Sequence, residues 1–182
     1  PDTASNFYND YKKDIRLMKE AGLKTVRTSI QWSRLIDDLE LNTLNEEAVA
    51  FYNAVIDEFI AQGITPMMNL HHFDLPVELY HRYGGWASKT VVDLYAGFAE
   101  QAFRLFGDRV KTWFTHNEPL VVVEGGYYKQ FHYPMKIEGK TAVQVAYNLQ
   151  LASSKAIEKY RALKLDGQIG IILNLTPSYP RD

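Results

Sequence analysis

Apolar residues along this chain recur with two different spacings, and each spacing predicts a different kind of element. A first helix is predicted from residues three or four positions apart: Phe7, Tyr11, Ile15 and Met18. Gly22 stands where this helix should end. Residues 45–62 show the same spacing, with an apolar stripe made of Phe51, Val55, Phe59 and Ile60. Two more helices are predicted over residues 90–106 and 141–163, and a short one after Pro119, a residue that suits a first helical turn.

Between the helices lie short apolar runs that predict strands. They are KTVRTSI (24–30), ITPMMNL (64–70), VKTWFT (110–115) and QIGIILNL (168–175). These runs are nearly continuous rather than alternating, which is typical of parallel strands covered on both faces. Their starts lie roughly 40 to 60 residues apart, so the pattern indicates βα repetition with insertions.

Parallel βα repetition fits either a doubly wound sheet or a (β/α)8 barrel. Neither G-x-G-x-x-G nor G-x-x-x-x-G-K-[ST] occurs, so a nucleotide-binding sheet would lack its phosphate loop. A full barrel typically needs about 250 residues. We therefore interpret residues 1–182 as one α/β domain, a partial (β/α)8 TIM barrel of about four βα units. We expect the first strand and the C-terminal half to lie outside it.

Composition narrows the possible partners. The chain is 46% hydrophobic and 23% charged, with a formal net charge of -2 and no cysteine. This balance gives no reason to expect nucleic acid or an anionic membrane surface as a partner. No apolar run reaches the roughly 18 residues of a membrane span. The absence of cysteine excludes disulfides and thiolate metal sites and fits a reducing compartment, so we expect a cytoplasmic protein. We also expect no metal or cofactor.

Polar residues cluster where the predicted strands end, which is where barrels carry their functional groups. Read in chain order, these ends provide Arg27 and Trp32, then His71, His72 and Asp74, then Asn117 and Glu118, and finally Asn174. Each has a structural alternative. Arg27 could form an ion pair, His72 could be a hydrogen-bonded core histidine, Asp74 could cap a turn, and Trp32 could be part of the core. Together they supply hydrogen-bonding groups and an aromatic face, as a polyhydroxylated ligand requires.

Five segments in this order resemble glycoside hydrolase family 1, the family of β-glucosidases and 6-phospho-β-glycosidases. They are NDYKKDIRLMKEAGLKTVRTSIQWSRL, LHHFDLP, GGWAS, FGDRVKTWFTHNEP and IGIILNLTPSYP. The resemblance implies a (β/α)8 barrel that cleaves β-glycosides with retention of configuration. Glu118 matches the general acid/base, Asn117 the amide that binds the sugar 2-hydroxyl, His72 a sugar-binding histidine and Arg27 the arginine beside the nucleophile. We also expect Trp32 and Asn174 to bind substrate.

The chain departs from the family pattern at several points. The common Y-H-W-D reads His71-His72-Phe73-Asp74, and the Phe before N-E-P reads His116. No E-N-G motif, which carries the family's nucleophile, occurs in these residues, and neither does the first strand with its sugar-binding Gln. Phe73 and the stretch YYKQFHYP resemble the bacterial 6-phospho-β-glucosidase branch. We therefore expect 6-phospho-β-glucosides as substrates and a nucleophile outside this chain.

Three alternatives stay open at this point. The substrate could be an unphosphorylated β-glucoside. The chain could be an inactive sugar-binding fragment, or an unrelated βα domain with polar strand ends. We also expect unpaired sheet edges, which would favour a homo-oligomer or an edge-paired dimer.

Overall fold

The computed structural model describes residues 4–177 and 179–181. Its strands are β1 (Thr25–Ser29), β2 (Ile36–Asp38), β3 (Thr43–Leu44), β4 (Thr65–His71), β5 (Thr112–Asn117) and β6 (Gln168–Ile172). Its helices are α1 (Phe7–Glu20), α2 (Trp32–Leu35), α3 (Glu46–Ala61), α4 (Val77–Tyr83), the 3-10 helix η1 (Gly85–Ala87), α5 (Lys89–Phe106), α6 (Pro119–Tyr127) and α7 (Gly139–Ala162).

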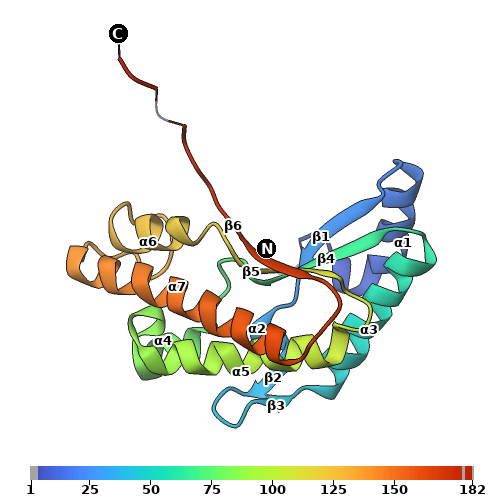
Figure 1. Cartoon of the computed structure of the whole chain (residues 1–182), viewed down its shortest axis with the longest axis horizontal. Coiled ribbons are helices and arrows are strands. Elements are labelled where there is room, and N and C mark those ends of the chain that lie inside the picture. Colours follow the sequence, from blue (N-terminus) through green and yellow to red (C-terminus); the bar gives the residue numbers. More distant parts are fainter. Residues whose placement is uncertain (1–3, 178, 182) are drawn as a thin grey trace.

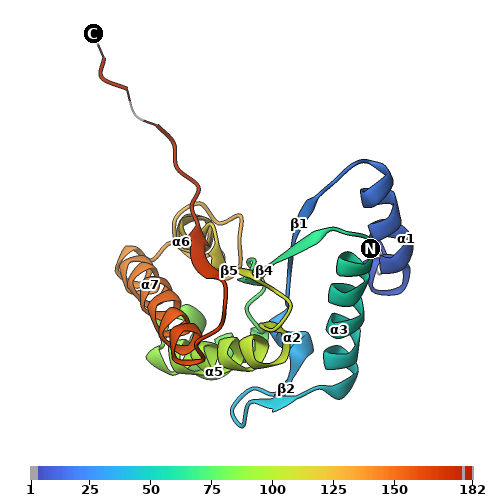
Figure 2. The same ribbon diagram turned by 45° about the vertical axis from the view of Figure 1, so that its right-hand side comes forward.

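Four strands form one parallel sheet in the order β1-β4-β5-β6. Each connection from one strand of this sheet to the next contains a helix, as in a βα barrel. Figures 1 and 2 show α3, α5 and α7 following the sheet on one side, with α1 beside α3. Beyond β6 the chain runs away from the body of the protein (Figure 1). The expected fold of about four βα units is therefore confirmed.

The main core fills the space between the sheet and helices α5 and α7. Its largest fully buried side chains include Trp113 of β5 and Tyr95, Phe98, Phe103 and Phe106 of α5. A second, smaller core joins α1, α3 and the start of β4 through Ile15, Val55, Phe59 and Ile64. The two cores pack against the strands whose ends carry the predicted site residues.

The long helices and the four parallel strands agree with the predicted ones, but several shorter elements, α2 and η1 among them, were not predicted. The antiparallel hairpin β2–β3 and helix α4 were not predicted. Strand β6 ends at Ile172, three residues before the predicted end. On α3, Ile60 is 44% exposed and does not belong to the buried stripe. Within the described residues, no helix is long and apolar enough to cross a membrane.

Candidate active site

Glu118 lies between the end of β5 and the start of α6. Its backbone is left-handed, with φ 45° and ψ 60°, and Pro119 begins the helix behind it. Phe73, just after β4, also has a positive φ, of 73°. Such conformations cost a non-glycine residue about 1–3 kcal/mol and cluster at functional sites. Of the seven non-glycine residues with positive φ among those described, these two lie at the ends of the neighbouring strands β4 and β5, where the predicted site residues gather.

Two contacts hold Glu118 in place. Its backbone N–H donates to the carbonyl oxygen of Ile172 on β6, at 2.9 Å. Its carboxylate Oε2 lies 3.4 Å from Nδ2 of Asn174, which donates to it. The side chain is half-buried, so the carboxylate is anchored on one side and open on the other. The predicted site residues Glu118 and Asn174 are thus brought together.

Arg27 and Asn117 form the second pair. Arg27 Nη1 donates to Asn117 Oδ1 at 2.8 Å, across from β1 to β5. Asn117 is only 3% exposed, and this bond fixes which way its amide points. With Oδ1 occupied, Nδ2 is the amide atom left to donate to a ligand. Arg27 therefore orients the Asn117 amide, and its observed partner is this amide rather than the carboxylate of an ion pair.

His72 follows β4 and is exposed, so the alternative of a core histidine is wrong. Its Nδ1 lies 3.5 Å from Ser29 Oγ, and its backbone N–H donates to Asp74 Oδ1 at 2.9 Å. Burial raises the pKa of Asp74, and the N–H of His72 opposes that rise. Ser29, His72 and Asp74 share a cavity of about 340 Å³ with Gln31. The cavity is polar at this rim and wide enough for a sugar-sized ligand.

Trp32 does not face this rim. It is 2% exposed and stacks on Phe98 of α5, with ring centroids 5.3 Å apart and planes 9° from parallel. Tyr95 packs edge-on against the same ring. The indole is therefore a core residue, and the expectation that it stacks on a sugar is corrected. The sequence favoured a strand-end position for Trp32, but helix α2 turns the ring inward.

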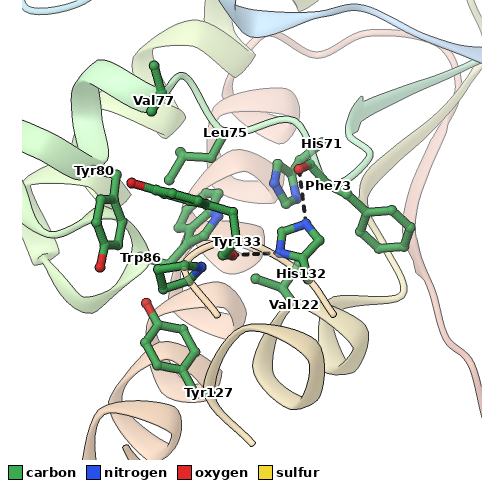
Figure 3. Close-up of a pocket in the computed structure, with 11 residues that line it drawn as sticks. His71, Phe73, Leu75, Val77, Tyr80, Trp86, Val122, Tyr127, His132 and Tyr133 are labelled. Carbon is green, nitrogen blue, oxygen red and sulfur yellow. Dashed lines mark hydrogen bonds between the residues drawn. The ribbon is translucent and has the colours of Figure 1, made fainter. Parts of the chain in front are cut away.

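A second cavity, of about 100 Å³, lies beside the end of β4 (Figure 3). Its walls are mostly aromatic and include Phe73, Trp86 and Tyr133. His132 closes one side, with Nε2 3.2 Å from the carbonyl oxygen of Phe73 and Nδ1 2.7 Å from that of Tyr133. The sequence analysis did not single out His132 or Trp86. Both lie in segments quoted for the family resemblance or its branch, Trp86 in GGWAS and His132 in YYKQFHYP.

Taken together, a carboxyl group, an oriented amide, a guanidinium and an imidazole lie at the carboxyl ends of adjacent parallel strands. Among the described residues, no group of three or more His, Asp or Glu side chains is arranged to hold a metal ion. The set can donate and accept hydrogen bonds with hydroxyl groups, and Glu118 can exchange a proton with them.

The fold and this site define a segment of a (β/α)8 barrel of the glycosidase type. The comparison with known families agrees: Glycosyl hydrolase family 1 matches residues 1–182, and the chain belongs to that family.

Two curated relatives carry phosphorylated substrates in their names. The chain is 57% identical to the 6-phospho-beta-glucosidase GmuD of Bacillus subtilis, over all of this chain and 38% of the relative. It is 38% identical to a 6-phospho-beta-galactosidase of Clostridium acetobutylicum, over 98% of the chain and 38% of that protein. The chain therefore spans less than half the length of the curated relatives it matches.

The solved structures give the same fold. A family 1 β-glucosidase from Thermotoga maritima superposes with a TM-score of 0.88 at 36% identity, covering 93% of this chain and 38% of that one. The AHE enzyme from Alicyclobacillus herbarius gives a TM-score of 0.91 at 32% identity, covering 96% and 39%.

Proposed function

We propose that the complete protein containing this chain is a retaining β-glycosidase that hydrolyses 6-phospho-β-glucosides. Glu118 is its general acid/base, and its nucleophile lies in the part of the barrel outside these residues. The observation that carries the proposal is the placement of Glu118 at the end of β5, held by Ile172 and Asn174 beside the Arg27–Asn117 pair.

The mechanism needs two carboxyl groups about 5 to 5.5 Å apart, one acid and one nucleophile. In the first step Glu118 protonates the departing glycosidic oxygen while the nucleophile attacks the sugar. In the second step the ionised Glu118 takes a proton from water, and that water displaces the nucleophile. The two attacks come from opposite faces of the anomeric carbon and each inverts it, so the configuration is retained overall.

The remaining residues assist by binding. Asn117 donates Nδ2 to the sugar 2-hydroxyl, a bond that strengthens as the oxocarbenium-like transition state forms. His72, exposed at the next strand end, contacts the sugar ring hydroxyls. The positive charge of Arg27 helps to keep the nucleophile ionised, because a nearby cation favours the charged form of a carboxyl group. Asn174 orients the Glu118 carboxylate.

The preference for a 6-phosphorylated sugar rests on the similarity to GmuD and to the Clostridium enzyme. A second candidate, hydrolysis of unphosphorylated β-glucosides, is favoured by 38% identity to Beta-glucosidase A of Acetivibrio thermocellus. The cytoplasmic location belongs with the first candidate and stays a prediction.

Kinetics on the full-length enzyme separate the two candidates. The first predicts a higher kcat/KM for cellobiose 6-phosphate, phosphorylated on the non-reducing glucose, than for cellobiose; a higher value for cellobiose would favour the second. On the better substrate, Glu118→Gln should lower kcat by about 10²- to 10⁴-fold, the usual worth of a general acid. Glu124→Gln is the matched control, since Glu124 lies on α6 and pairs with Lys129. Equal activity of the two variants would contradict the role of Glu118.

A further inference from the structure

Near the candidate site, strand β5 has one more residue than its partner β6, which makes a β-bulge. Phe114 pairs with Gly170 of β6 and Asn117 pairs with Ile172, so three steps along β5 match two steps along β6. On the other side the register with β4 is regular, and His116 is paired with His71. An extra residue of this kind redirects the side chains that follow it. Here the residues that follow are Asn117 and Glu118.

The bulge lets two consecutive side chains of β5 reach the same helix. In a regular strand they would point to opposite faces. Thr115 Oγ1 lies 2.7 Å from Ser153 Oγ, and His116 Nε2 lies 3.0 Å from the carbonyl oxygen of Leu149. Leu149 and Ser153 are one turn apart on α7. The irregular end of β5 is therefore attached to α7 at two successive points.

The bond made by His116 defines its tautomer. A carbonyl oxygen can only accept, so the imidazole carries its proton on Nε2 and donates it to Leu149. The ring is fully buried, stacks on Tyr95 at 5.0 Å, and has His71 and Trp86 edge-on against it. Among the described residues, Nδ1 has no hydrogen-bond partner. Burial lowers the pKa of His116 to about 3, which keeps this donor arrangement at neutral pH.

We infer that His116 is a positioning residue: its hydrogen bond to Leu149 locks the bulge of β5 and thereby fixes the direction of Asn117 and Glu118. A hydrophobic residue at position 116 can fill the same space but cannot hold the strand end to α7 at that point. The inference rests on the proposed function, because the expected effect on catalysis depends on the direction in which the Glu118 carboxyl group points.

The test compares two substitutions in the full-length enzyme. His116→Phe keeps a buried ring and removes the donor, whereas His116→Gln keeps an N–H donor of similar reach. A misplacement on the order of 1 Å costs about 10²-fold in rate, so we expect His116→Phe to lower kcat about 10- to 100-fold with KM changed less than about threefold. His116→Gln should recover most of the lost kcat. Phe59→Leu, in the separate core of α1 and α3, serves as a control for reduced stability alone and should keep its kcat.

Hydrogen exchange gives a second readout that does not depend on activity. The Glu118 amide, bonded to Ile172, should exchange about tenfold faster in His116→Phe than in Phe59→Leu, and near the wild-type rate in His116→Gln. If the wild type shows no glycosidase activity, the proposed function fails and exchange alone decides the positioning role. Wild-type kcat and exchange in His116→Phe would overturn the inference. So would equal losses in His116→Phe and His116→Gln, because they would assign the effect to ring packing.

Discussion

The sequence predicted which residues lie near the strand ends better than it predicted the directions of their side chains. Asn117 ends β5 and Glu118 directly follows it, and these two residues contact Arg27 of β1 and Asn174, just beyond β6. The prediction for Trp32 was wrong because the direction of its side chain depends on Phe98. This partner lies about 65 residues further along the chain, and local spacing does not reveal it.

The two adjacent histidines after β4 illustrate the same limit. His71 is buried against His116, and His72 is exposed beside Ser29. The alternation of a strand predicts that neighbours point apart, but not which of them points inward. The roles of Glu118 and Asn117 came from the family resemblance, and they stay predictions until they are measured.

The buried histidine pair predicts a specific loss of stability in acid. Burial lowers the pKa of both His71 and His116, that of His116 to about 3. An imidazole in the unfolded chain titrates near about pH 6.5, so below that pH the unfolded state binds protons that the folded state refuses. The free energy of unfolding therefore falls as the pH drops from about 6.5 toward 3. For His116 the loss at about pH 5 is about 2 kcal/mol.

Urea unfolding of the full-length protein at several pH values between about 5 and 7 checks this expectation. His116→Phe removes one of the two protonation sites, so its free energy of unfolding should fall less steeply with acid than that of the wild type. Parallel curves for the two proteins would contradict the burial argument.

At the level of elements, the long helices and the four parallel strands could be predicted because their apolar spacing repeats over many residues. The hairpin β2–β3 could not, because its strands have only three and two residues. Arg82 of α4 pairs with Glu40 in the turn of that hairpin and with Glu78 on its own helix. Contacts such as Arg82–Glu40 join segments that are distant in sequence, so a local sequence pattern does not predict them.

The turn before β6 should be intolerant of a side chain. A Cβ on Gly167 would lie 2.5 Å from the carbonyl oxygen of Lys111 and 2.6 Å from the hydroxyl of Tyr160. That carbonyl accepts the N–H of Gln168, which starts the β5–β6 pairing. Gly167→Ala should therefore lower the free energy of unfolding by about 1–3 kcal/mol, the usual cost of overpacking.

Gly170 provides the matched control within the same element. A Cβ built on Gly170 meets no atom of the described residues within 4 Å, so Gly170→Ala should leave the thermal midpoint nearly unchanged. Thermal unfolding of the two variants beside the wild type makes the comparison. A midpoint for Gly167→Ala equal to that of Gly170→Ala would show that the turn can shift without cost.

For the molecule as a whole, the sheet ends at β1 on one side and β6 on the other. Each of these strands is paired along one edge only within the described residues. Next to β6, Leu120, Leu173 and Leu175 are at least half exposed and line an apolar hollow of about 210 Å³. The chain spans 38% of its relative GmuD, and we expect further barrel strands to cover these surfaces in the complete protein.

The isolated 182-residue chain should consequently self-associate and should lack glycosidase activity. Unpaired parallel strands favour pairing with another copy. The E-N-G motif that carries the family's nucleophile does not occur in the sequence, and the mechanism needs that second carboxyl group. Analytical ultracentrifugation over a range of concentrations, together with an aryl glycoside assay, tests both expectations. A strictly monomeric species, or turnover that Glu118→Gln abolishes, would contradict them.

The role of Glu118 in the complete enzyme is the central claim, and one reaction tests it most directly. Glu118→Ala should still be glycosylated by a 2,4-dinitrophenyl 6-phospho-β-glucoside, because so good a leaving group needs little acid assistance. Hydrolysis of the intermediate, which needs the base, should then become limiting, giving a burst and a low apparent KM. Azide needs no base and can attack the intermediate beside the shortened side chain. The account predicts a β-configured glycosyl azide. An α-configured azide, or a folded variant with neither burst nor azide product, would contradict the assignment of Glu118 as acid/base.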